Sequence, residues 1–221
     1  KIIFNNTSDK IIFGKHFSYK KNVNGFLFKD NLGEINLPFP NLNGDFQISN
    51  VSTAIAAVRN LNQFKITDDH IKKSITKIRS EGRLQEITDG NLRNYVSKNN
   101  QILVDGAHNV LAASAVEKYL KSLNSGKKII MLLGMMANKE HREFIEIFKN
   151  RVQSIITLDI PNQTNFIDKE KLSTIAKSCG IPSRTDNTIE KALKNAAKEN
   201  SDAIIFCTGS LYFAGEILNL N

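Results

Sequence analysis

Short apolar runs separated by turn-forming residues dominate the first 40 positions of the chain. Asn24-Gly25 and Asn31-Leu32-Gly33 carry the turn chemistry, and the runs between them are typical of short β-strands. These runs lie at 2–4, 11–13, 17–19, 26–28 and 35–37. The set is too small to form a stable sheet alone, so it predicts the edge of a larger domain.

Two helical patterns follow this β-rich segment. The first begins near Ser49, and the second runs from Asp68 to Arg79 with Thr67 as its N-cap. Apolar residues recur in both at intervals of three or four, which places them on one face of each helix. The inward-facing positions are predicted to be Val51, Ala54, Ile55, Val58, Leu61, Ile71, Ile75 and Ile78.

From Gln101 onward, apolar runs of strand length alternate with helical periodicity. The predicted strands cover 102–104, 129–133, 155–158 and 203–207. Repeated βα units of this length predict a mostly parallel sheet with helices on both faces. The expected fold class is therefore α/β, with a Rossmann-like domain at 83–221 preceded by a separate α/β segment at 1–82.

The helices of the second region carry start and stop signals. One begins at Asp168 and ends at Gly180, and another has a capping-box pattern at Asn187 and Glu190. The helices after the first and last strands should each pack one stripe of side chains onto the sheet. Those stripes are predicted to contain Leu111 or Ala112, Ala115 or Val116, Tyr119 or Leu120, Leu123, Leu211, Ala214 or Gly215, and Leu218.

Polar residues follow the strand at 102–104 in the place where a parallel sheet binds ligands. The strand stops at Asp105, and His108 and Asn109 lie in the turn before the next helix. Side chains and helix N-terminal amides converge at the carboxyl ends of such strands. A structural alternative has Asp105 capping the helix and Asn109 satisfying backbone donors. That alternative leaves His108 unexplained.

Two further polar residues have both a functional and a structural interpretation. Arg83 follows Gly82, and a guanidinium presented from a sharp turn suits a phosphate. The structural interpretation is an exposed arginine in a linker, which the same sequence would also give. Asn50, at the start of the first predicted helix, is explained locally as a cap.

Composition excludes several classes of protein. A chain of 221 residues with 41% hydrophobic and 24% charged residues is typical of a soluble globular protein. It has neither an apolar run of about 18 residues nor a signal-peptide pattern, so we expect no membrane partner and a cytoplasmic location. Cys179 and Cys207 have no partners at metal-ligand spacing, which predicts buried, reduced thiols and no metal site.

The formal net charge of +8 would attract polyanions in general. Lys and Arg are scattered along the chain, and no basic run with interleaved aromatic residues appears. Nucleic acid is therefore not an expected partner.

Four segments together resemble the folylpolyglutamate synthase/dihydrofolate synthase family of the ATP-dependent Mur ligase superfamily. They are LPFPNLNGDFQISNVSTAIAAV (37–58), EGRLQEI (81–87), LVDGAHN (103–109) and CTGSLYFAGEIL (207–218). Their order and spacing match the family over nearly the whole chain. The resemblance implies an ADP-forming ligase that adds L-glutamate to folate or dihydropteroate through an acyl phosphate, with ATP and Mg²⁺ as cofactors.

The same resemblance implies a set of nucleotide contacts. Asn50 would meet the adenine, Arg83 the phosphates, Asp105 the ribose hydroxyls and His108 the phosphate side of the nucleotide. No catalytic residue follows from it. Relatives carry His-Gln before the Asn, and this chain has Phe46-Gln47 instead.

The phosphate-binding loop of this family, GxxxxGK[ST], does not occur in the sequence, where 125–128 lacks the leading glycine. We therefore expect 1–82 to be the C-terminal remnant of the ATP-binding domain. The chain should be inactive alone, with the missing N-terminal region as its partner, and otherwise a monomer. The alternatives are another amino-acid ligase of the Mur superfamily, or a non-catalytic remnant that binds a nucleotide or a partner.

Overall fold

The computed structural model describes residues 2–4, 10–61, 63–123 and 126–221 of the chain. The chain forms two compact units, divided between Ser80 and Glu81. The sequence places this boundary between residues 82 and 83. The Gly82 carbonyl, however, accepts a hydrogen bond from the Gly106 amide at 2.8 Å, which ties residue 82 to the second unit.

The first unit contains two small antiparallel sheets. Its strands are β1 (Ile2–Phe4), β2 (Lys10–Ile12), β3 (Phe17–Asn22), β4 (Gly25–Asp30) and β5 (Gly33–Pro38). β1 pairs with β2, and β3, β4 and β5 form a meander. Each hairpin of the meander closes over two residues, because Asn22 pairs with Gly25 and Asp30 pairs with Gly33. Both predicted turns are confirmed.

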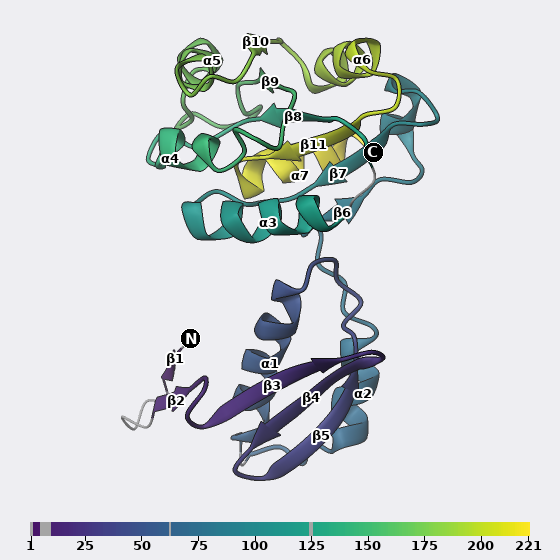
Figure 1. The fold of residues 1–221 in the computed structure, drawn as a ribbon, viewed down its shortest axis with the longest axis vertical. Helices are drawn as coiled ribbons and strands as arrows, with labels where there is room; N and C mark the ends of the chain where they lie inside the picture. The colour runs from purple at the N-terminus through teal and green to yellow at the C-terminus, as the bar shows by residue number, and fades with distance from the viewer. Residues whose placement is uncertain (1, 5–9, 62, 124–125) are drawn as a thin grey trace. The chain divides into compact units, whose positions relative to one another are not determined.

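Helices α1 (Phe46–Arg59) and α2 (Asp68–Ile75) cover one face of the β3–β5 sheet (Figure 1). The core between them consists of Phe17, Phe26, Phe28, Ile35, Leu37, Ile48, Val51, Ile55, Ala56, Ile71 and Ile75. α1 begins earlier than the predicted start near Ser49, because Asp45 takes the N-cap position directly after Gly44. Gly44 has a φ of 95°, which a glycine adopts without strain.

α2 is shorter than predicted, although its start is as expected. The Thr67 hydroxyl accepts a hydrogen bond from the His70 amide at 3.3 Å, which confirms the predicted cap. The helix ends at Ile75 instead of Arg79. The Ile75 carbonyl accepts a hydrogen bond from the distant Asn41 amide at 3.1 Å, so it does not serve a further helical turn.

The second unit is built on a six-stranded sheet in the order β10-β9-β8-β11-β7-β6. The strands are β6 (Gln85–Glu86), β7 (Gln101–Val104), β8 (Ile129–Leu133), β9 (Ser154–Thr157), β10 (Ser183–Thr185) and β11 (Ile204–Thr208). All neighbouring pairs are parallel except β6 with β7. The predicted α/β class with a mostly parallel sheet is confirmed.

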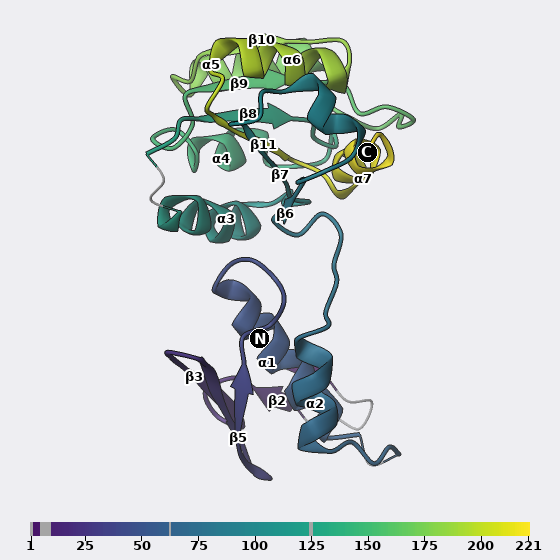
Figure 2. The same ribbon diagram turned by 90° about the vertical axis from the view of Figure 1, so that its right-hand side faces the viewer.

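Helices cover both faces of this sheet, as Figure 2 shows for α3 and α4 on one side and α7 on the other. The helical segments are η1 (Asn91–Tyr95), α3 (Val110–Ser122), α4 (His141–Glu146), α5 (Lys169–Ser178), α6 (Ile189–Glu199) and α7 (Leu211–Asn219). One core joins η1, α6 and α7 to the sheet. On the opposite face the ring of Phe148, just after α4, lies 6.0 Å from that of Phe206. Every residue of β8 and β11 is buried, as expected for strands covered on both faces.

Some predicted inward-facing side chains point to solvent. Leu111 is 83% exposed and Leu211 is 46% exposed, so their predicted packing onto the sheet is wrong. Val116, Leu120 and Ala214, each one of two predicted alternatives, are buried, and so are Ala113, Phe213 and Ile217, which were not predicted. A three- or four-residue period fits several adjacent stripes of one helix, and only the contact with the sheet selects among them.

The cap of α6 differs from the prediction by one residue. The Thr188 hydroxyl accepts a hydrogen bond from the Lys191 amide at 3.2 Å, so Thr188 is the N-cap. Asn187 instead accepts a hydrogen bond from Lys169 Nζ at 2.6 Å. The capping box predicted at Asn187 is therefore wrong. The prediction that α5 begins at Asp168 is confirmed, because Asp168 is its cap.

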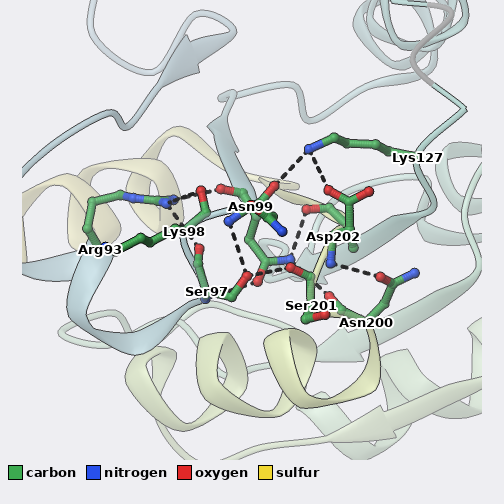
Figure 3. A network of polar contacts seen from close by, with 10 residues as sticks. Arg93, Ser97, Lys98, Asn99, Lys127, Asn200, Ser201 and Asp202 are labelled. Atoms are coloured by element: carbon green, nitrogen blue, oxygen red, sulfur yellow. Dashed lines mark hydrogen bonds and ion pairs between the residues drawn. The ribbon is translucent and has the colours of Figure 1, made fainter.

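At the amino edge of the sheet, a polar network ties together the segments that precede three strands (Figure 3). Arg93 donates to the Asn100 carbonyl at 2.9 Å, and the Asn100 side chain donates to the Ala203 carbonyl at 3.0 Å. Lys127 donates to the Asn99 carbonyl at 2.7 Å and lies 2.9 Å from Asp202. These side chains form hydrogen bonds with backbone carbonyls and an ion pair with one another, so the network stabilises the loops of this edge.

At the opposite, carboxyl edge, the loops after β7, β8 and β11 pack closely on one another. The Gly209 amide donates to the Ala107 carbonyl at 3.0 Å, and the Gly134 amide donates to the Thr208 carbonyl at 3.2 Å. Gly209 has a φ of 111°, and a Cβ there would lie 2.6 Å from the Gly134 carbonyl oxygen. Only glycine fits this position, and the three strand ends are fixed relative to one another.

We expect Gly209→Ala to lower the free energy of unfolding by about 2 kcal/mol or more, through its positive φ and the backbone overlap. Gly215→Ala is the matched control, because no atom lies within 4 Å of a Cβ added there in α7. That variant should raise stability by roughly 0.5–1 kcal/mol. Urea unfolding of the chain measures both, and equal effects would contradict the crowding at Gly209.

Candidate active site

The carboxyl ends of β8, β11 and β7 are neighbours in the sheet, and the turn after β7 contains the predicted site residues Asp105 and His108. This turn runs from Asp105 to Asn109 and leads into α3. The Asn109 side chain accepts a hydrogen bond from the Ala112 amide at 2.9 Å and is the N-cap of α3. The predicted role of Asn109 as a partner of backbone donors is confirmed.

Asp105 is buried, with 3% of its surface exposed, and both of its carboxylate oxygens are hydrogen-bonded. Oδ1 accepts from the Ala107 amide at 2.7 Å, within the turn. Oδ2 accepts from the Leu84 amide at 2.9 Å, from a segment far away in the sequence. The alternative in which Asp105 caps the helix is therefore wrong, because Asn109 holds that position.

Burial raises the pKa of the Asp105 carboxyl above its ordinary value. The backbone hydrogen bonds from Leu84 and Ala107 oppose this shift, and so do the nearby charges of Arg83 and His108. A buried carboxyl surrounded by cationic and amide donors at a strand end is typical of a functional site.

Arg83 lies in the four-residue segment Gly82–Gln85, which we call the Arg83 loop. The residues on either side of Arg83 have left-handed backbones, with φ of 62° at Gly82 and 48° at Leu84. Leu84 is fully buried, while Arg83 itself is partly exposed. The loop thus anchors its apolar residue inside the unit and presents the guanidinium next to Asp105.

His108 is partly exposed in the turn, and its Nδ1 lies 2.9 Å from the Gly106 carbonyl oxygen. A carbonyl oxygen only accepts, so this contact places a proton on Nδ1. Nε2 is then the ring nitrogen that can contact a ligand, as an acceptor when the ring is neutral and as a donor when it is protonated.

Arg83, Asp105 and His108 are thus brought together, whereas Asn50 belongs to the first unit. Asn50 is exposed on α1, and its side-chain amide donates to Gln47 Oε1 at 2.9 Å. It lies within the helix and does not cap it, because Asp45 holds the N-cap position. The local interpretation of Asn50 as a cap is therefore wrong.

The two cysteines lie outside the polar chemistry of this site. Cys179 and Cys207 are free and buried, as predicted. Burial raises the pKa of the Cys207 thiol to about 12, so this side chain stays protonated at neutral pH. It is therefore not a nucleophile, although it lies in β11 next to the last residue of the strand.

Comparison with known proteins gives the chain a family. Residues 83–211 match the family described as Mur ligase, glutamate ligase domain, which is more than half of the chain. The chain belongs to this Mur ligase family. The match begins at Arg83, the residue that the Arg83 loop presents. None of the helices that the structure describes has both the length and the apolar character needed to cross a bilayer.

Relatives of this Mur ligase chain are known in sequence and in structure. The dihydrofolate synthetase of Saccharomyces cerevisiae is 24% identical over 193 residues, which cover 81% of this chain and 45% of the yeast protein. E. coli FolC in complex with DHPP and ADP has a TM-score of 0.73 at 19% identity and covers 94% of this chain and 46% of its own. The folylpolyglutamate synthase of Mycobacterium tuberculosis complexed with ADP and AMPPCP has a TM-score of 0.75 at 21% identity. The likeness covers 94% of this chain and 48% of that one.

A third solved structure is the bifunctional folylpolyglutamate synthase/dihydrofolate synthase of Yersinia pestis, complexed with AMPPNP and Mn ion. Its TM-score is 0.74 at 16% identity, and the likeness covers 94% of this chain and 46% of that one. At such identities, likeness in structure shows the fold alone. The chain spans about half the length of the relatives that it matches.

The Mur ligase domain has further polar residues after its strands that the sequence does not single out. Ser210 follows β11, is 2% exposed and accepts a hydrogen bond from the Tyr212 amide at 3.1 Å, so it caps α7. His141 follows β8, and its Nε2 lies 3.0 Å from the Met136 carbonyl oxygen. For Ser210 the position just beyond a buried strand was the available signal, as it was for Asp105, whereas His141 begins α4 and is eight residues past β8.

Asp105→Asn removes the titration of the buried carboxyl and tests its raised pKa. A raised pKa in the folded state means that the contribution of this group to stability is present below the unfolded pKa of about 4 and is lost as pH rises through the folded pKa. The free energy of unfolding of the unaltered chain should therefore fall relative to that of the variant as pH rises from about 4. Urea unfolding at several pH values measures the difference, and a rise with pH would contradict the shift.

Proposed function

We propose that this chain is the C-terminal part of an ATP-dependent amide ligase that joins L-glutamate to a folate, to dihydropteroate, or to both. The observation that carries the proposal is the convergence of Arg83, Asp105 and His108 at the carboxyl edge of the parallel sheet, inside a glutamate ligase domain. Relatives with this fold are named as folylpolyglutamate and dihydrofolate synthases, and several are complexes with ADP or its analogues.

The proposed nucleotide contacts follow from the chemistry of each side chain. Arg83 would bind the phosphates through its planar guanidinium, and His108 would donate to the phosphate side of the nucleotide. Each oxygen of Asp105 uses one acceptor position on a backbone amide and has a second that would accept from the ribose hydroxyls. Asn50 of the first unit would contact the adenine.

The proposed reaction has two steps that balance without a redox partner. The folate carboxylate takes the terminal phosphoryl group of ATP, which gives an acyl phosphate and ADP. The amine of L-glutamate then attacks the acyl carbon, phosphate leaves, and an amide remains after loss of a proton. Arg83 and His108 would stabilise the charge on the transferred group, because fixed donors stabilise charge that develops during transfer. No general base is assigned.

Mg²⁺ would neutralise phosphate charge in such a reaction. Among the residues that the structure describes, no group of three His, Cys, Asp or Glu side chains lies close enough to hold a metal ion. The proposal therefore assigns none of these residues to Mg²⁺.

We propose that residues 1–82 are the C-terminal part of the ATP-binding domain of this ligase, and that 83–221 form its glutamate ligase domain. The structural likeness to FolC extends over 94% of the chain, which includes both segments. The partner would be the N-terminal region that carries the phosphate-binding loop. Otherwise the protein would act as a cytoplasmic monomer on small molecules, without nucleic acid.

Arg83→Ala tests the nucleotide site directly. ADP binding, measured by calorimetry, should weaken by about tenfold to a hundredfold, because a charged hydrogen bond contributes about 1.5–3 kcal/mol. Arg151→Ala is the matched control, since Arg151 precedes β9 at the opposite edge and binds Glu117 at 3.0 Å. Equal ADP affinity in both variants would remove Arg83 from the site.

Activity is tested with dihydropteroate or tetrahydrofolate, L-glutamate and ATP, with and without a fragment that carries a phosphate-binding loop. We expect amide product, identified by mass spectrometry, only when that fragment is present. Turnover by the chain alone at about 1 per second would contradict the expected dependence on the fragment. ADP binding without product in any mixture would favour the non-catalytic alternative, and product with another acceptor would favour a different Mur-family ligase.

A further inference from the structure

The Arg83 loop depends on contacts with the turn that follows β7. The Gly106 amide donates to the Gly82 carbonyl at 2.8 Å, and the Gly82 amide donates to Gln85 Oε1 at 3.0 Å. The Leu84 amide donates to Asp105 Oδ2 at 2.9 Å. Beyond the loop, Gln85 pairs with Val104 in the β6–β7 ladder. The loop is therefore attached on both sides of Arg83, and the Asp105 side chain contacts it from the β7 turn.

The backbone of Leu84 is in a conformation that needs such support. Its φ of 48° is left-handed, which costs a leucine about 1–2 kcal/mol. A residue persists in this region when its surroundings determine its conformation. At Leu84 these surroundings include the buried environment of its side chain and the carboxylate of Asp105, which accepts a hydrogen bond from its amide.

We propose that Asp105 is a positioning residue for Arg83, and that its carboxylate fixes the Leu84 amide and thereby the direction in which the loop presents the guanidinium to the phosphates. This inference rests on the proposed function, which places phosphates at Arg83. It adds to the ribose contact a second role that acts through another side chain.

The chemistry of the two hydrogen bonds explains why this residue is an aspartate. Two backbone amides, of Leu84 and Ala107, converge on the two oxygens of one side chain. Asparagine has one acceptor oxygen, and its NH₂ group would face the other amide with donor against donor. Asp105→Asn therefore has to release one of the two amides, and we expect it to release Leu84, because an asparagine side chain readily keeps the local bond to an amide two residues on.

The test combines Asp105→Asn and Arg83→Ala, singly and together, with ADP and adenosine as ligands. Adenosine keeps the ribose and lacks the phosphates, so it separates a ribose contact from an effect through Arg83. Asp168→Asn is the control, because Oδ1 of Asp168 accepts both backbone amides, of Glu170 and Lys171, at the start of α5, and an asparagine keeps that one acceptor oxygen. Hydrogen exchange of the Leu84 amide, followed by NMR, reports on the loop without any ligand.

We expect Asp105→Asn to weaken ADP binding about tenfold more than it weakens adenosine binding, because only ADP has phosphates for Arg83 to bind. In the Arg83→Ala background, Asp105→Asn should weaken ADP and adenosine binding equally, because two residues that act as a unit are not additive. The Leu84 amide should exchange faster in Asp105→Ala, which has no acceptor for either amide, than in the unaltered chain. Asp168→Asn should change none of these quantities.

A Leu84 amide that stays protected in a folded Asp105→Ala variant, which has no acceptor for either amide, would overturn the proposal whatever the affinities are. Equal losses for ADP and adenosine, additive with Arg83→Ala, would overturn it as well and leave Asp105 as a ribose ligand only. If the unaltered chain fails to bind ADP, the proposed function fails, and the exchange of the Leu84 amide still decides whether Asp105 holds the loop.

Discussion

The hydrogen bonds of the Asp105 carboxylate are the interaction on which the candidate site depends. One oxygen holds the turn that carries His108, and the other holds the loop that carries Arg83. The Arg83 loop and the turn that carries His108 lie about 20 residues apart in the sequence. The local sequence of either segment therefore does not determine their relative position. The buried Asp105 side chain, together with the backbone bond from Gly106 to Gly82, thus holds Arg83 and His108 around one strand end.

This edge of the sheet gathers features that are unfavourable one by one. A carboxyl is buried against its solvation preference, Leu84 has a left-handed backbone, and Gly209 is surrounded so closely that no side chain fits. At the amino edge, by contrast, Arg93 and Asn100 are bonded to backbone carbonyls and stabilise loops. Unfavourable local conformations and burial that are concentrated at one edge of an otherwise well-packed sheet are typical of a functional site.

The sequence predicts the βα alternation well because fully buried parallel strands appear as continuous apolar runs, such as 129–133. It misses β10, whose residues Ser183–Thr185 are partly exposed and polar, and β6, which has only two residues. Asp105 and His108 were predicted as site residues from their place after a strand. The bond from Leu84 was not predictable, because it depends on two left-handed residues and on a partner 21 positions away. Similarly, Asn187 and Thr188 are both good caps, and only the contact of Asn187 with Lys169 decides between them.

The distribution of charge explains why position matters more than total charge at this site. Although the chain has a net charge of +8, basic and acidic residues nearly balance between 81 and 221. A nearly neutral unit gives a polyanion little long-range attraction, and surface charges are screened beyond about 10 Å at ordinary salt. Affinity for phosphate then has to come from a few donors at short range. Arg83 and His108 meet that requirement only while the loop and the turn that carry them are held together. The buried Asp105 carboxylate holds them together, because it accepts one hydrogen bond from each segment.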